Sequence, residues 1–279
     1  MNVFNQLQPM TDDMLRRAAP SIFATEKHVS RSQRYAYIPT FEIVTAMRNE
    51  GFAPVLAKQS RTRIEGKAPF TKHMIRFQRL DAPSVRSLGD VVASLCLVNS
   101  HDGTSAYQLM SALDRLVCLN GLTIKLAEMD DVRIHHSGDV VGKVIEGSYR
   151  VIETSAKVTD RALEWNGINL TDGEIGAFAR SAARLRFDSE SAVNPMQLVA
   201  PRRQADVAPT LWNVFNRAQE ALLKGGQRHY SATGRRQTVR PVNSIDKDVG
   251  LNQALWTLGE EMAKLKAGVA SAADIAALS

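Results

Sequence analysis

The stretch VVASLCLVNSHDGTSAYQLMSALDRLVCLNGL, from Val91 to Leu122, is the part of the sequence that decides the fold. Its first part is apolar and rich in β-branched residues, which predicts a buried strand. A polar turn follows at Asn99–Gly103. Ser105 and Gln108 then have the spacing of a capping box, apolar residues recur at helical intervals, and Gly121 suits a C-terminal cap. We therefore expect a buried strand that runs through a polar turn into a buried helix.

The turn itself has several interpretations. It contains neither glycine-rich phosphate-binding motif. His101 and Asp102 could act as a base with its orienting carboxylate, or as metal ligands together with His135 and His136. The alternative, which we favour, is an Asp-Gly turn in which Asp102 bonds its own backbone. We predict no catalytic residue, no metal and no cofactor.

The composition narrows the class of protein. The chain has 279 residues with 35 Lys and Arg against 29 acids, a formal charge of +6 that favours an anionic partner. Its two cysteines, Cys96 and Cys118, lie in apolar runs and are too few for a disulfide scaffold, so we expect both to be buried and reduced. We see no secretion signal and no apolar run near the roughly twenty residues that cross a bilayer. We expect a cytoplasmic protein that does not contact a membrane.

Upstream of the stretch, two strand-like runs, Pro54–Arg63 and Phe70–Leu80, are joined by a short Gly- and Pro-containing connection, which predicts a hairpin. Ile75 and Phe77 alternate with polar residues, so we expect one face to be buried and the other to present cations. The only carboxylate between residues 54 and 80 is Glu65. The hairpin therefore either faces an anion or is a solvated edge that its charges protect from aggregation. Its cations are Lys58, Arg61, Arg63, Lys72 and Arg76.

Helices are predicted on both sides of this unit. Before it, a helix begins at Pro39–Thr40 and ends near Asn49; after it we expect a small hairpin over residues 123–135 and then further helices. Those helices begin near Asp139, Thr171, Thr210 and Asp248. The expected fold class is α+β, a small antiparallel sheet (the basic hairpin plus the buried central strand) packed on helices, with a helical C-terminal part. We expect an N-terminal arm at residues 1–34, an α+β core at 35–187 and a C-terminal helical region at 188–279.

A basic loop interrupts the C-terminal region at residues 224–241, KGGQRHYSATGRRQTVRP, which has no acidic residue. Guanidinium groups contact phosphates and a tyrosine ring can stack on an unpaired base. The alternative is a disordered insert. The candidate contacts in this loop are Arg228, Tyr230, Arg235 and Arg236.

With these motifs set out, the chain resembles the phage- and plasmid-borne family called domain of unknown function nine hundred thirty-two. The resemblance covers roughly Tyr35 to Met262 and rests on four segments: Ser100–Ser105, Arg115–Gly121, His136–Gly138 and Thr210–Asn216. It implies a context of mobile elements and DNA metabolism, and the family's name specifies no reaction. A basic three-stranded sheet followed by a long helix is also similar, at the level of fold alone, to ring-forming single-strand annealing proteins.

We accordingly predict a non-enzymatic protein that binds or anneals single-stranded DNA, with single-stranded DNA and further copies of the same chain as partners. Two alternatives remain: a metal-assisted nucleic-acid hydrolase, and a protein-binding factor that counteracts host defence. The predicted DNA contacts are Lys58, Arg61, Arg63, Lys72, Arg76, Arg228, Tyr230, Arg235 and Arg236.

Overall fold

The computed structural model describes residues 8–32, 35, 37–81, 91–115, 120–124, 140–187, 193–230 and 234–268. The chain separates into two compact units, Met1–Thr159 and Asp160–Ser279. The division therefore falls inside the helix α3 (Val140–Gly167), whereas the sequence suggested a boundary at residue 188.

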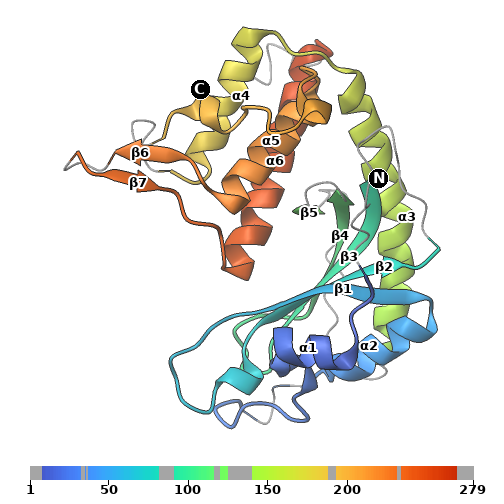
Figure 1. Cartoon of the computed structure of the whole chain (residues 1–279). Coiled ribbons are helices and arrows are strands. Elements are labelled where there is room, and N and C mark those ends of the chain that lie inside the picture. Colours follow the sequence, from blue (N-terminus) through green and yellow to red (C-terminus); the bar gives the residue numbers. More distant parts are fainter. Residues whose placement is uncertain are drawn as a thin grey trace. The chain divides into compact units, whose positions relative to one another are not determined.

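The first unit is built on a five-stranded antiparallel sheet in which neighbours along the chain are also neighbours in space (Figure 1). Its strands, in order, are β1 (Phe52–Gln59), β2 (His73–Arg79), β3 (Val91–Asn99), β4 (Gln108–Arg115) and β5 (Asn120–Ile124). Its helices are α1 (Asp12–Ala18), α2 (Thr40–Asn49) and most of α3, with 3-10 turns at Pro20–Phe23 and Ala68–Phe70. The predicted α2, the β1–β2 hairpin, β3 and α3 are all confirmed, and so is the α+β class.

One face of this sheet carries the apolar core. Successive residues of a strand point to opposite faces, and Ile75 and Phe77, which share one face of β2, are completely buried. They belong to a cluster with residues of β3, β4 and the helices. The cluster includes Ile43, Val44 and Met47 of α2, Leu95 and Leu97 of β3, Leu109 of β4, and Val144 and Val151 of α3. Burial of this face confirms the alternation read from the sequence.

The opposite face of β2 is also buried, and here the prediction of solvent-facing cations is wrong. Arg76 is only 3% exposed, and its guanidinium lies against β4 and β5. It donates hydrogen bonds to the Asp114 carboxylate at 2.9 Å, the Gly121 carbonyl at 2.8 Å and the Thr123 hydroxyl at 2.7 Å. Gln78 donates to the second carboxylate oxygen of Asp114 at 3.0 Å. The Arg76 charge is thus neutralised inside the unit by an ion pair that joins β2 to β4.

The helix predicted over residues 105–121 is wrong, because the described residues 108–115 form β4 and residues 120–124 form β5. The expected capping box does not form: the Ser105 amide donates to the Ser100 hydroxyl, and the Ser105 hydroxyl donates to the Ala106 carbonyl. Gly121 serves close approach and not helix termination. A Cβ built there would lie 2.0 Å from the Cζ atom of Arg76, so only glycine lets β5 reach the guanidinium.

The second unit begins within α3 and contains three more helices and a small hairpin. These elements are α4 (Asp172–Arg184), α5 (Leu211–Lys224), β6 (Arg228–Tyr230), β7 (Arg236–Thr238) and α6 (Ile245–Lys266), with 3-10 turns at Pro195–Gln197 and Gln204–Asp206. The sequence predicted each of these helices, and the capping box of Thr171 and Glu174 is present. Its core is aromatic, with the rings of Trp165 and Trp256 only 4.4 Å apart between centroids.

Two further expectations concern cysteines and membranes. Cys96 on β3 is completely buried, as predicted, whereas Cys118 lies outside the described residues. In the part of the chain that the structure describes, no helix is both long and apolar enough to cross a membrane. The small hairpin expected over residues 123–135 lies mostly outside the described residues, and its first positions belong to β5.

The Arg76–Asp114 pair generates a stability prediction. Asp114→Ala should lower the free energy of unfolding by about 3–5 kcal/mol, because it leaves a buried guanidinium without its carboxylate. Asp81→Ala is the matched control, since Asp81 pairs with Arg79 at the surface and is 70% exposed on its side chain. Urea unfolding should show a lower midpoint for Asp114→Ala and an unchanged one for Asp81→Ala. Equal midpoints for the two variants would show that the buried pair contributes no more to stability than the surface pair of Arg79 and Asp81.

Candidate nucleic-acid interface

A buried polar cluster lies where β2 begins and β3 ends, beside the start of α2. The imidazoles of His73 and His101 are both completely buried, with ring centroids 5.1 Å apart. The Thr40 hydroxyl, at the first position of α2, lies 2.9 Å from Nε2 of His73 and 3.4 Å from Nε2 of His101. Nδ1 of His73 is 2.9 Å from the Ser21 hydroxyl, and Asn99 donates to Thr40 at 3.0 Å. Sequence reasoning did not single out His73, although its position in line with Ile75 and Phe77 marks it as a core residue.

Burial keeps both imidazoles neutral. Loss of hydration lowers the pKa of His73 to about 3, with a smaller contribution from His101, and lowers the pKa of His101 to about 4. Neither ring reaches solvent, so neither is placed to accept a proton from a bound substrate. The cluster is therefore structural, and His101 anchors the turn that follows β3.

Asp102 has partners of its own in that turn. Its Oδ1 atom accepts from the amide of Thr104 at 3.0 Å and from the hydroxyl of Thr104 at 2.6 Å, and its Oδ2 atom lies 3.3 Å from Nζ of Lys67. Burial alone would raise the pKa of Asp102, but these hydrogen bonds and the Lys67 charge together hold it below its usual range. The predicted turn, with Asp102 bonded to its own backbone, is confirmed.

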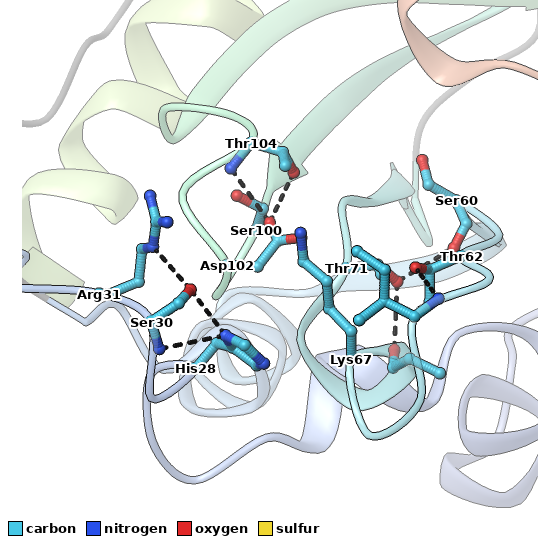
Figure 2. A network of polar contacts seen from close by, with 12 residues as sticks. His28, Ser30, Arg31, Ser60, Thr62, Lys67, Thr71, Ser100, Asp102 and Thr104 are labelled. Carbon is cyan, nitrogen blue, oxygen red and sulfur yellow. Dashed lines mark hydrogen bonds and ion pairs between the residues drawn. The ribbon is translucent and has the colours of Figure 1, made fainter.

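The turn joins two other segments of the first unit, and Figure 2 shows Asp102 of the turn beside Lys67 of the β1–β2 connection. The His101 amide donates to the Phe70 carbonyl at 2.9 Å, and the His101 carbonyl accepts from the His28 amide at 2.9 Å. The Tyr35 hydroxyl donates to the Ser100 carbonyl at 2.6 Å. Together with the Lys67–Asp102 contact, these bonds fasten the β1–β2 connection and the N-terminal segment to the end of the sheet.

The predicted cations of the first hairpin differ in their exposure to solvent. Arg61 and Arg63 lie exposed in the β1–β2 connection, and Lys58 is partly exposed at the end of β1. Lys72 and Arg76 are 7% and 3% exposed, so their side chains do not lie on the surface that was expected to meet phosphates. The physical reason for the burial of Arg76 is that its guanidinium reaches across β3 to Asp114 of β4, a partner that the helical interpretation of this segment had hidden.

The basic loop of the second unit is an antiparallel hairpin with exposed side chains. Tyr230 pairs with Arg236 and Arg228 pairs with Thr238, so these four residues share one face of the ribbon. Arg228 and Arg236 are exposed, and Tyr230 is 70% exposed. The ribbon projects beyond the helices of its unit (Figure 1). Arg235 is exposed where β7 begins.

The hairpin is fixed at its base. The side chain of Gln197 donates to the Arg228 carbonyl at 3.2 Å and accepts from the Arg228 amide at 3.1 Å. Gly226 donates to the Val239 carbonyl, and Val239 donates to the Gln227 carbonyl, both at 2.9 Å. The alternative of a disordered insert is therefore wrong at β6 and β7, where backbone pairing positions the basic and aromatic side chains.

A metal site has no support among the residues described. They contain no group of three or more His, Cys, Asp or Glu side chains that could hold a metal ion. His135 and His136, the other ligands considered from sequence, lie outside the described residues. His101 and Asp102 are adjacent in sequence, but their side chains bond to different partners.

The buried imidazoles predict a pH-dependent stability. Their folded pKa values lie below the unfolded value of about 6.5, so their contribution is fully present above about pH 6.5 and is lost as pH falls toward 4 and 3. Because the unfolded state would bind up to two more protons, the free energy of unfolding should fall by up to about 2.7 kcal/mol per pH unit. Urea unfolding between pH 7.5 and 5 measures this slope.

His28→Gln is the control, because His28 is partly exposed and lies outside the cluster; its slope should equal that of the wild type. His101→Gln should lower the slope by about 1.4 kcal/mol per pH unit, because unfolding of this variant takes up about one proton fewer. A wild-type stability that stays constant from pH 7.5 to 5 would contradict the neutral, buried placement of these rings.

The comparisons agree with the resemblance noted from the motifs. A family model described as Domain of unknown function (DUF932) matches residues 27–256. Two relatives from Escherichia coli (strain K12) are similar over 262 residues, 94% of each chain: the UPF0380 protein YafZ at 39% identity and the UPF0380 protein YfjQ at 38%. No solved structure matches the chain.

Proposed function

The chain belongs to the DUF932 family, and we propose that it binds single-stranded DNA without catalysing a reaction, holding the strand for annealing. The observation that carries the proposal is the β6–β7 ribbon, on which two arginines and an exposed tyrosine share one face. Cations that contact phosphates, next to a ring that stacks on a base, form the usual combination of single-strand binding surfaces.

The geometry of the ribbon suits an extended strand. Arg228 and Tyr230 are two residues apart on β6, about 7 Å along the strand, and Arg236 lies directly across from Tyr230. An aromatic ring between two guanidinium groups can take a base while its neighbours contact the flanking phosphates. The surrounding sequence favours an anion as well, because residues 224–241 contain no carboxylate to repel one.

The first unit supports the same proposal with a smaller set of cations than the sequence suggested. Arg61 and Arg63 remain candidates for phosphate contact because they lie exposed in a connection that is fastened to the sheet. Lys58 is partly exposed. Arg76 is not used in the proposal, because its guanidinium is buried against Asp114.

The hydrolase alternative lacks a comparable observation. Phosphodiester hydrolysis with metal ions needs clustered carboxylate or imidazole ligands that reach the substrate. The residues described show no such cluster, and the His101 ring is buried. A non-catalytic binding surface is therefore the function that the described geometry supports best.

The experiment is a fluorescence anisotropy titration with a labelled oligo-dT strand at several salt concentrations. Each phosphate contact contributes about 0.7 to the slope of log affinity against log salt for a single strand. Changing Arg228 and Arg236 to Gln together should lower the slope by about 1.4 and weaken binding. Tyr230→Ala should weaken binding by about 1–3 kcal/mol with the slope unchanged, and Tyr230→Phe should bind like the wild type.

The charge-matched control changes Arg180 and Lys247 to Gln, since both are exposed on helices of the same unit and lie off the ribbon. This variant should keep the wild-type affinity and slope to within a small general effect of charge. Loss of slope equal to that of the Arg228 and Arg236 variant would show that net charge, and not the ribbon, determines binding. Absence of binding by the wild type at micromolar concentration would refute the proposed function.

A further inference from the structure

An apolar side chain occupies the tip of the β1–β2 connection. Ile64 is 61% exposed, although a branched aliphatic side chain gains free energy when it leaves water. It is flanked by exposed arginines at 61 and 63. A single exposed aliphatic residue is common at protein surfaces, so exposure alone indicates no function. The way in which the backbone holds Ile64 is the more informative observation.

The tip is a hydrogen-bonded turn. The Ile64 amide donates to the hydroxyl of Thr62 at 3.1 Å, and the Ile64 carbonyl accepts from the amide of Lys67 at 3.3 Å. Gly66 adopts a φ of +72° at the third position of this turn, a conformation that L side chains rarely adopt. The backbone around Ile64 is therefore fixed from both sides, and the side chain is presented by an ordered turn.

The base of the connection is fixed as well. The Thr71 hydroxyl donates to the Ser60 carbonyl at 3.0 Å, and the Gln59 side chain donates to the Ala68 carbonyl at 2.6 Å. Lys67 contacts Asp102 in the turn after β3 (Figure 2). These contacts connect the turn that carries Ile64 to the sheet. A molecule that presses on Ile64 would therefore meet a side chain held in a fixed position.

We propose that Ile64 is a wedge that packs against the exposed terminal base pair where a duplex meets a single strand, while Arg61 and Arg63 contact the flanking phosphates. This inference rests on the proposed function and adds the class of DNA that the protein prefers. Apolar wedges that enter duplex DNA must unstack base steps, which costs free energy. At a junction the end of the base stack is already exposed, so the wedge buries apolar surface without that cost.

The local charge agrees with this assignment. Glu65 is also exposed on the tip and disfavours a nearby phosphate, but the two arginines outnumber it. A membrane or a protein partner would also bury an exposed isoleucine. Flanking guanidinium groups next to an apolar tip match the alternation of phosphate backbone and stacked bases, and for this reason we assign the tip to DNA.

The test compares three labelled DNAs: a forked duplex, a single strand and a blunt duplex, with 2-aminopurine at the terminal pair of the fork. The wild type should bind the fork more tightly than the single strand and should change the 2-aminopurine fluorescence, because Ile64 replaces water on the exposed face of the terminal pair. Ile64→Ala should lower fork affinity about tenfold, which corresponds to about 1.4 kcal/mol, and should leave single-strand affinity unchanged. Ile64→Leu should retain the fork preference, since it keeps the apolar volume.

Leu80→Ala is the matched control, because Leu80 is 70% exposed just after β2, away from the connection that carries Ile64. It should behave like the wild type on all three DNAs. If Ile64→Ala equals the wild type on the fork while single-strand binding through Arg228 and Arg236 persists, the wedge is refuted and the proposed function stands. If no DNA binds, both are refuted. Ile64-dependent binding to vesicles of anionic phospholipid, without a fork preference, would also overturn the wedge.

Discussion

The buried ion pair between Arg76 and Asp114 is the interaction on which the first unit depends. A guanidinium taken out of water is stable only beside a carboxylate and enough acceptors for its donors, and here β4 and β5 supply both. The pair requires Asp114 to face the same side of the sheet as Arg76, and it requires glycine at position 121. These demands fix the register across the sheet on its polar face, while the apolar face contributes most of the hydrophobic burial.

This dependence explains which parts of the fold the sequence predicts. Local signals decide α2, α4 and α5, because a cap and a periodic apolar face are written in consecutive residues. The segment at 105–121 carries a capping-box spacing too, but its apolar residues suit a strand as well as a helix. The contacts that make this segment a strand come from β3 and Arg76, which lie elsewhere in the sequence. The local pattern alone therefore predicts a helix where the structure has strands.

The same argument applies to the candidate site. Exposure of Arg61 and Tyr230 follows from their polar or glycine-rich surroundings, and the sequence identified both. Burial of Arg76 and the pairing of Tyr230 with Arg236 depend on contacts between strands, which no local pattern specifies. The turn with His101 and Asp102 illustrates a further point. His and Asp are typical of catalytic sites, yet both residues are buried here. Their described contacts hold the β1–β2 connection in place.

The central claim is that an exposed basic and aromatic ribbon, not the His101–Asp102 turn, contacts single-stranded DNA. Photocrosslinking with a 5-iodouracil-substituted single strand, followed by mass spectrometry of the peptides, tests it most directly. The account predicts adducts on the peptide that contains β6, with Tyr230 as the modified residue, because its ring is exposed where a base would stack. Adducts confined to the segment from Ser100 to Ser105, or to helices of the second unit, would contradict it.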